Sequence, residues 1–130
     1  MQDSEILDHN IFNQLVEMDD DEHVFLSQLI LNYFKHAETT FDKIRYCINT
    51  GDLDQLSRLG HSLKGSSASI GLTRMKQACE RLQVLGKYKE QVDSNMPDEY
   101  LIEAAKIELK ATEIEYKRVE EMFIYFFENQ

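Results

Sequence analysis

Apolar residues recur every three to four positions through most of the chain, the pattern of amphipathic helices. Five segments carry this pattern and predict helices at about residues 8–18, 21–49, 52–70, 74–89 and 98–127. A single proline and five glycines leave few breaks, which favours long helices over many short strands. We therefore predict an all-α fold.

The four long segments each contain a stripe of residues that would face a common core. The expected core residues are Leu26, Ile30, Tyr33, Phe34, Ala37, Phe41, Ile44, Ile48, Leu56, Leu59, Leu63, Ile70, Met75, Ala78, Leu82, Leu85, Leu101, Ile102, Ala105, Leu109, Thr112, Tyr116, Val119, Phe123, Phe126 and Phe127. Because short loops join these segments, we predict an antiparallel up-down four-helix bundle, with the short N-terminal helix across one end.

Residues that favour helix ends flank several of these segments. The acidic stretch 19–22 is expected to end the first helix and cap the second. Asp52 precedes Gln55 by three positions, as in a capping box. Gly71 is a natural C′ glycine for the third helix, and Thr73 can cap the fourth.

Length and composition are those of one globular domain. The chain has 130 residues, of which 42% are apolar, enough for a single hydrophobic core. No apolar run approaches the roughly 20 residues of a membrane span, and residues 1–10 lack the pattern of a signal peptide. Cys47 and Cys79 form no CxxC and are expected to be buried free thiols. We expect a monomer in the cytoplasm, with the nucleus accessible at this size and no association with membranes.

Charge is distributed unevenly along the chain. The net charge of −10 argues against nucleic acid as a partner, because proteins that bind nucleic acid usually carry a basic face. Residues 61–89 nevertheless have a net charge of +5, which leaves −15 on the rest. This basic segment can attract one anionic group, although a solvated helix face with no ligand explains the charge equally well.

The candidate site is His61, in the third predicted helix. It lies about 140° from the core residue Leu56 on a helical wheel, so it is expected to be exposed. Its neighbours on the same face are Lys64, Gly65 and Ala68. The pattern predicts an exposed imidazole one turn from a cation, with little side-chain bulk around it.

These residue types suit phosphoryl chemistry. A neutral imidazole can attack phosphorus and form a phosphoramidate, and a nearby ammonium stabilises the added charge. A glycine inside a helix costs about 1 kcal/mol relative to alanine, but Gly65 would leave His61 accessible to a second protein. The alternatives are an ordinary surface histidine and, for residues 65–69, close helix packing in which Ser66 and Ser67 take part.

A second set of polar residues lies on one face of the fourth predicted helix. It comprises Lys76, Glu80, Gln83 and Lys87. If this helix runs antiparallel to the third, Gln83 can offer a hydrogen bond to His61 or its phosphoryl group, and Lys87 can offer a charge. For Glu80 we expect plain exposure to solvent.

The stretch His61–Gly71 resembles the HxLKGSSAxxG signature of eukaryotic histidine phosphotransfer domains. Residues 79–87 and 18–21 are similar to the fungal branch, the Ypd-type phosphorelay proteins, and the resemblance runs from about Ile11 to the end. It implies a four-helix bundle with an extra N-terminal helix, phosphorylation of His61, and Lys64 as its supporting residue. Lys87 stands where a fungal relative has arginine, which keeps the charge but loses the bidentate geometry.

The resemblance also implies partners and a type of activity. The partners would be the receiver domains of a hybrid histidine kinase and of response regulators. The chain would carry phosphate without ATP-dependent kinase activity and without a metal of its own, because Mg²⁺ would belong to the receiver's acidic pocket.

Other function classes fit the sequence less well. A histidine kinase needs a nucleotide-binding domain, and the chain has no P-loop or comparable glycine-rich phosphate loop. A di-metal bundle needs Glu-x-x-His pairs, and none of the four histidines has glutamate three positions before it. A non-catalytic helical adaptor remains the alternative, but it leaves the His61 neighbourhood unexplained.

The first helix has more apolar residues than one contact surface can cover. Phe12 and Val16 lie roughly 100° around the wheel from Ile11, Leu15 and Met18, and we expect Phe12 and Val16 to pack inward. The remainder would form an exposed docking patch for receivers near His61. The expected docking residues are Ile11, Leu15, Met18, Phe25, Leu29, Ser66 and Ala68. The alternative is that Ile11 and Leu15 turn inward and Phe12 is exposed.

Overall fold

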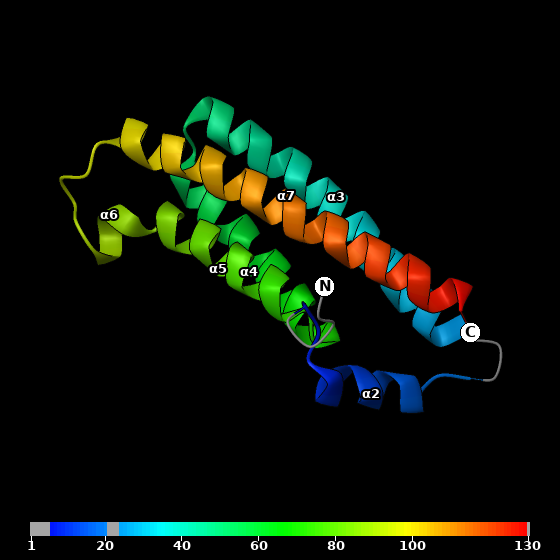
Figure 1. Cartoon of the computed structure of the whole chain (residues 1–130). Helices are drawn as coiled ribbons and strands as arrows, with labels where there is room; N and C mark the ends of the chain where they lie inside the picture. The colour runs from blue at the N-terminus through cyan, green and yellow to red at the C-terminus, as the bar shows by residue number, and fades with distance from the viewer. Residues whose placement is uncertain (1–5, 21–23, 130) are drawn as a thin grey trace.

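The computed structural model describes residues 6–20 and 24–129, and within them it is helical with no strands beyond one isolated backbone bridge. The helices are α2 (His9–Glu17), α3 (Val24–Thr50), α4 (Leu53–Ile70), α5 (Thr73–Gly86), α6 (Tyr88–Gln91) and α7 (Asp98–Glu128). Four of them run lengthwise as a bundle, with α2 at one end and α6 at the other (Figure 1). This confirms the predicted all-α up-down bundle with an additional N-terminal helix. None of the helices in the described residues is both long and apolar enough to cross a membrane.

The predicted core stripes line the interior of the bundle. α4 packs against α3 and α5, and α7 packs against α5 and α3. Most of the expected core residues are buried, including Leu63, Met75 and Phe123. Both cysteines are free and buried, as predicted. The exceptions are half-buried residues that pack against the core's edge: Phe34, Leu85, Ile102, Phe126 and Phe127.

Three of the predicted helix ends are confirmed by backbone geometry. The Asp52 carboxylate accepts the Gln55 N–H at 3.0 Å, and Gly71 ends α4 with φ of +83°. The Asp20 carboxylate accepts the Val24 N–H at 2.8 Å, so the acidic stretch does cap the second helix. The expected start of that helix at residue 21 lies outside the described residues.

Two expected helix ends were wrong. Thr73 is the first residue of α5 and not its cap; Leu72 occupies the cap position without a side-chain hydrogen bond. Leu72 is buried there and forms a backbone bridge with Leu7 from the N-terminal segment. The fourth helix ends at Gly86 rather than at residue 89, because Lys87 has φ of −106° and ψ of 8° and separates α5 from α6.

Two glycines allow α4 and α5 to approach closely. A Cβ added to Gly60 would lie 2.9 Å from the Gln83 nitrogen and 3.0 Å from the Cys79 carbonyl oxygen. At Gly86 a Cβ would lie 2.5 Å from the Leu53 carbonyl oxygen. Because all three contacts are with backbone, larger residues would push the helices apart. The close approach sets the polar face of α5 directly beside α4.

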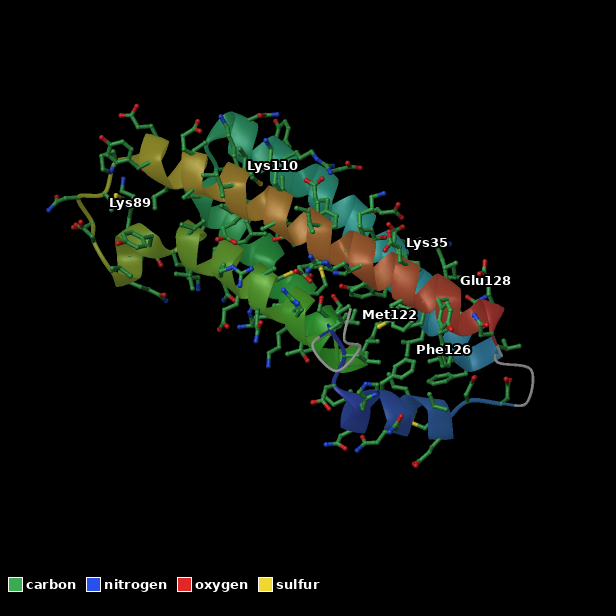
Figure 2. All side chains as sticks on the ribbon, viewed as in Figure 1. Lys35, Lys89, Lys110, Met122, Phe126 and Glu128 are labelled. Carbon is green, nitrogen blue, oxygen red and sulfur yellow. The ribbon has the colours of Figure 1, made fainter. Side chains whose placement is uncertain are left out.

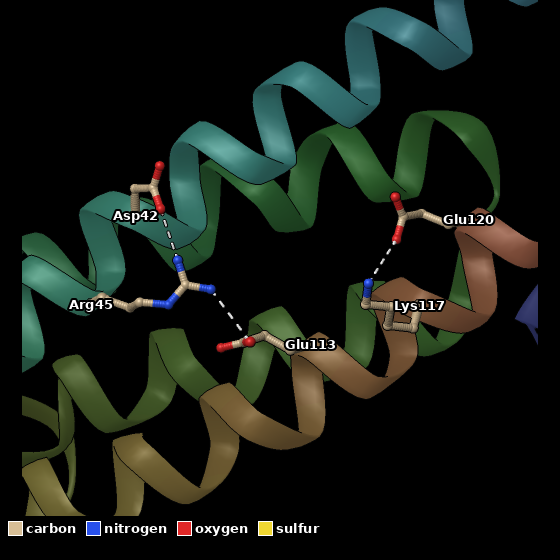
Figure 3. Close-up of polar contacts among 5 residues, drawn as sticks. All are labelled: Asp42, Arg45, Glu113, Lys117 and Glu120. Carbon is tan, nitrogen blue, oxygen red and sulfur yellow. Dashed lines mark hydrogen bonds and ion pairs between the residues drawn. The ribbon is translucent and has the colours of Figure 1, made fainter.

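Polar contacts fix α3 against its neighbours. The Tyr33 hydroxyl and the Ser67 Oγ lie 2.8 Å apart in a buried hydrogen bond that joins α3 to α4. Arg45 of α3 pairs with Asp42 at 2.8 Å and reaches Glu113 of α7 at 3.3 Å (Figure 3). These contacts join α3 to α4 on one side and to α7 on the other.

Candidate functional site

His61 lies at the middle of α4 and is exposed, as the helical wheel predicted. The buried residues Leu59 and Leu63 flank it in sequence and anchor this part of α4 in the core. The imidazole is therefore presented to solvent from a rigid element. A group held in this way needs little reorganisation before it reacts with an incoming partner.

Lys64 is one helical turn from His61, and it reaches toward α5. Its side chain is 24% exposed, and its Nζ lies 3.7 Å from a carboxylate oxygen of Glu80. The sequence analysis expected Glu80 to be merely solvated and missed this ion pair. Partly exposed pairs of this length contribute little free energy, so another anionic group beside Lys64 can compete for the ammonium.

Gly65 faces open space. A Cβ added there would meet no atom within 4 Å, and the residue is exposed. This excludes close helix packing as the reason for this glycine; that role falls to Gly60, which the sequence analysis did not single out. No side chain therefore obstructs the surface at Gly65, one turn from His61.

The serines that follow Gly65 divide into two kinds. Ser67 is buried and hydrogen-bonded to Tyr33, so it does serve helix packing. Ser66 is half-buried, and its hydroxyl donates to the Ser62 carbonyl oxygen at 3.1 Å. Ala68 is also half-buried. Both residues remain partly accessible, but only Ala68 shares the face of His61, since Ser66 lies about 140° around the helix from it.

Gln83 carries an unpaired acceptor next to the candidate site. Its backbone nitrogen lies against Gly60, the residue before His61, and its Oε1 is buried without a hydrogen-bond partner among the described residues. A buried acceptor without a donor costs free energy and is uncommon in folded proteins. The Gln83 side-chain oxygen on α5 therefore has an unused capacity to accept a hydrogen bond.

Most of the predicted basic segment is neutralised by carboxylates. Four of its six cations form ion pairs: Lys64 with Glu80, Arg74 with Glu115 at 3.3 Å, Arg81 with Glu108 at 2.8 Å and Lys89 with Asp98 at 2.8 Å. Lys76 and Lys87 form no ion pair with the residues that the structure describes. Lys87 follows the last residue of α5, one turn beyond Gln83, and is half-buried. Charge counted along the sequence therefore overstates the local positive potential.

α2 packs against the C-terminal half of α7 through aromatic residues. Phe12 is buried, with its ring centroid 5.7 Å from that of Phe123 and 5.5 Å from that of Phe126, as predicted. Met122 and Phe126 project from α7 toward α2 (Figure 2). Val16 was also expected to pack inward, and this is wrong: it is 38% exposed. The aromatic rings already fill the contact, so Val16 lies at the rim of a groove between α2 and α7.

The other apolar residues of the expected docking patch differ in exposure. Met18 is 62% exposed and Phe25 is also exposed, as expected. Ile11, Leu15 and Leu29 are only half-buried rather than exposed. Ile11 packs against Gly71, where an added Cβ would lie 3.2 Å from its side chain, and Leu15 packs against the core. The surface is therefore smaller than predicted, and the alternative with an exposed Phe12 is wrong.

A second histidine borders the site and was missed by the sequence analysis. His36 of α3 is half-buried, and its Nε2 lies 3.4 Å from the hydroxyl of Ser62, the residue after His61. His36 lies one turn after the core residue Tyr33, which places it at the edge of the core stripe of α3. Only the packing of α3 on α4 shows that His36 faces Ser62.

Comparisons with known proteins agree with this site. The sequence matches the Hpt domain family over residues 28–119. The chain belongs to this family. The matched region contains His61, Lys64, Gly65, Gln83 and Lys87.

Two fungal phosphorelay proteins are similar to this Hpt domain in sequence. It is 49% identical over 90 residues to multistep phosphorelay regulator 1 of Schizosaccharomyces pombe, and the aligned residues cover 68% of the chain and 30% of the relative. It is 43% identical over 88 residues to the phosphorelay intermediate protein YPD1 of Saccharomyces cerevisiae, covering 67% of the chain and 53% of the relative. The matched region thus spans about half or less of the length of these relatives.

Solved structures extend the likeness over nearly the whole chain. The S. cerevisiae histidine phosphotransfer protein Ypd1, crystallised with the receiver domain of its downstream response regulator Ssk1, superposes with a TM-score of 0.85 at 27% identity and covers 96% of both chains. A plant phosphotransfer protein from Medicago truncatula has a TM-score of 0.79 at 22% identity, which shows the shared fold.

Proposed function

We propose that this Hpt domain is the phosphotransfer intermediate of a multistep phosphorelay, with His61 as the phosphorylated residue. The observation that carries the proposal is the combination on one face of α4: an exposed imidazole, an ammonium one turn away, and an open glycine. A helical adaptor would need none of these together. The names of the fungal relatives support the same function.

The proposed reaction is a direct displacement at phosphorus. The lone pair of His61 Nε2 attacks the phosphorus of an aspartyl phosphate in a receiver domain, the N–P bond forms, and the bond from phosphorus to the carboxylate oxygen breaks. The ring keeps its proton on Nδ1, and the aspartate carboxylate leaves. The same steps in reverse pass the phosphoryl group to the aspartate of a second receiver.

Each neighbouring residue has a proposed role in this displacement. The Gln83 oxygen accepts the Nδ1–H and so leaves Nε2 free to attack. Lys64 leaves Glu80 to stabilise the phosphoryl oxygens, and Lys87 adds a second, more distant positive charge. Gly65 keeps the line of approach to Nε2 clear of side chains.

We further propose that receiver domains of a hybrid histidine kinase and of response regulators dock on α2, the start of α3 and the exposed side of α4. The exposed Met18 and Phe25, with the partly exposed Ile11, Leu15 and Leu29, supply the apolar contacts; Ser66 and Ala68 border them. Support comes from the related Ypd1, which was crystallised with a receiver domain.

The decisive experiment is transfer from a purified phosphorylated receiver. The wild-type chain should gain phosphate that is labile to acid and stable to base, and His61→Gln should gain none. Binding of the receiver by both forms, with phosphate on neither, would instead establish the adaptor function.

We propose that the chain itself has no ATP-dependent kinase activity and no metal. Once the chain has been phosphorylated and separated from the receiver, chelation of Mg²⁺ should leave the amount of phospho-His61 unchanged. Metal-dependent labelling of the isolated chain by ATP would contradict this.

We also propose that the protein acts in the cytoplasm and the nucleus. Support comes from its two free buried thiols, which suit a reducing compartment. Microscopy of a fluorescent fusion expressed at native level tests the location.

A further inference from the structure

The outward face of α7 carries a regular apolar stripe that the proposed phosphotransfer site does not use. Tyr100, Ile107 and Ile114 are 66%, 69% and 55% exposed, respectively, and they follow one another at intervals of seven residues. Ala104 and Ala111 lie between them, each four residues after a bulky member. We call these five residues the α7 stripe. A seven-residue repeat keeps side chains on one line along a helix, as in the seam of a coiled coil.

The α7 stripe forms a ridge with a groove on either side. On one side, Val84, Leu85 and Tyr88 of the neighbouring chain segment line a groove with Ile107. On the other side, Ile107 borders a second groove together with Ile48 of α3. When two helices pack, the ridge of side chains on one lies in a groove of the other. Scattered surface apolar residues need no explanation, but an aligned series indicates a binding surface.

We propose that the partner is a second copy of this chain, packed antiparallel along α7. In this register Ile107 of each copy lies against Ala104 of the other, and Tyr100 lies against Ala111. Tyr100 and Ile107 of each copy then each meet an alanine, so the two helices can approach closely over this stretch. Ile114 lies opposite Pro97, at the start of the partner's α7. A parallel pair in register would instead set bulky residues at the level of bulky ones.

Charges beside the stripe favour the same arrangement. Glu103 and Lys110 lie along one edge of the stripe, one heptad apart. In the antiparallel register Glu103 of each copy faces Lys110 of the other, which gives two opposite-charge pairs. Lys110 forms no ion pair within the described residues and lies on the first half of α7 (Figure 2). Within the described part of the chain Glu103 pairs with exposed Lys106 alone, at 2.9 Å, and that weak contact can be exchanged.

A second copy at this position would leave the phosphotransfer site free. α4 and α7 occupy opposite corners of the bundle, since each packs against both α3 and α5. The association would be weak, because the net charge of −10 on each copy opposes it. It revises the expectation of a strict monomer to a monomer in equilibrium with a dimer at high concentration.

Charge reversal tests the register directly by sedimentation velocity over a concentration series. Lys110→Glu turns both pairs repulsive and should raise the dimer dissociation constant about tenfold. Lys117→Glu changes the net charge equally, but Lys117 lies outside the register and pairs with Glu120 at 3.8 Å (Figure 3), so this control should dimerise like the wild type. The double variant Glu103→Lys/Lys110→Glu should regain wild-type association. An equimolar mixture of the single variants Glu103→Lys and Lys110→Glu should also regain it.

The apolar contact is tested by Ile107→Asp, with Ile124→Asp as its control. Both residues are exposed on α7, but only Ile107 belongs to the stripe. Ile107→Asp should remove the dimer while its circular dichroism and its phosphate transfer remain those of the wild type. A wild-type chain that stays monomeric up to millimolar concentration would overturn the proposal, as would equal effects of Lys110→Glu and Lys117→Glu. Neither result would affect the proposed role of His61.

Discussion

Two glycines of α4, little more than one turn apart, should respond oppositely to substitution by alanine. Gly60 faces α5, where an added Cβ would lie 2.9 Å from the Gln83 nitrogen and 3.0 Å from the Cys79 carbonyl oxygen. Neither atom can move without moving α5. Gly65 has no atom within 4 Å of an added Cβ. The same methyl group is therefore an overpacked contact at one position and a free addition at the other.

The magnitudes follow from packing and helix propensity. Alanine gains about 1 kcal/mol over glycine inside a helix, so Gly65→Ala should stabilise the fold by up to that amount. At Gly60 this gain is set against overpacking of about 1–3 kcal/mol, and backbone contacts at 2.9 and 3.0 Å place it at the upper end. We expect Gly60→Ala to lower the free energy of unfolding by about 1–2 kcal/mol. The two variants should thus differ by about 2–3 kcal/mol.

The assay is urea denaturation of both variants and the wild type, followed by circular dichroism at 222 nm. Transfer from a phosphorylated receiver, measured on the same samples, separates stability from access. Gly65→Ala should be more stable yet transfer somewhat more slowly, and the bulkier Gly65→Leu should slow transfer further while remaining folded. A destabilised Gly65→Ala, or a Gly60→Ala variant as stable as the wild type, would refute the packing on which this reasoning depends.

Four further results are expected. His61→Gln should abolish phosphate acceptance and change the free energy of unfolding by less than about 0.5 kcal/mol, because His61 is exposed; undiminished transfer would exclude it as the acceptor. Lys64→Ala should slow transfer and shorten the lifetime of phospho-His61, Lys87→Ala should do so more weakly, and Lys87→Arg should be tolerated. The proposed electrostatic role fails if the two alanine variants match the wild type in quench-flow measurements of transfer and in the decay of phospho-His61. Met18→Asp should weaken receiver binding in calorimetry without a change in thermal unfolding, and unaltered affinity would remove Met18 from the docking surface. Burial raises the pKa of the Cys79 thiol to about 12, so the folded state binds this proton more tightly than the unfolded state does. The free energy of unfolding should therefore fall as pH rises from about 9 toward 12, and Cys79→Ala should flatten this part of the pH profile.

The helices, several of their ends and the exposure of His61 could be predicted from the sequence. These features depend on residues within one or two turns of each other. The capping of α4 by Asp52, its end at Gly71 and the angle between Leu56 and His61 are all local. The core stripes were predicted for the same reason, since a 3.6-residue period places them on one face of each helix.

The tertiary structure alone decided what faces what across helices. The pairing of Lys64 with Glu80, the contact of Gly60 with the backbone of α5 and the outward position of Val16 all involve residues that are distant in sequence. Helical periodicity gives the direction of a side chain from its own axis, but not the rotation and spacing of the neighbouring helix. Those depend on how closely two helices approach, and here the small volume of Gly60 and Gly86 sets that distance.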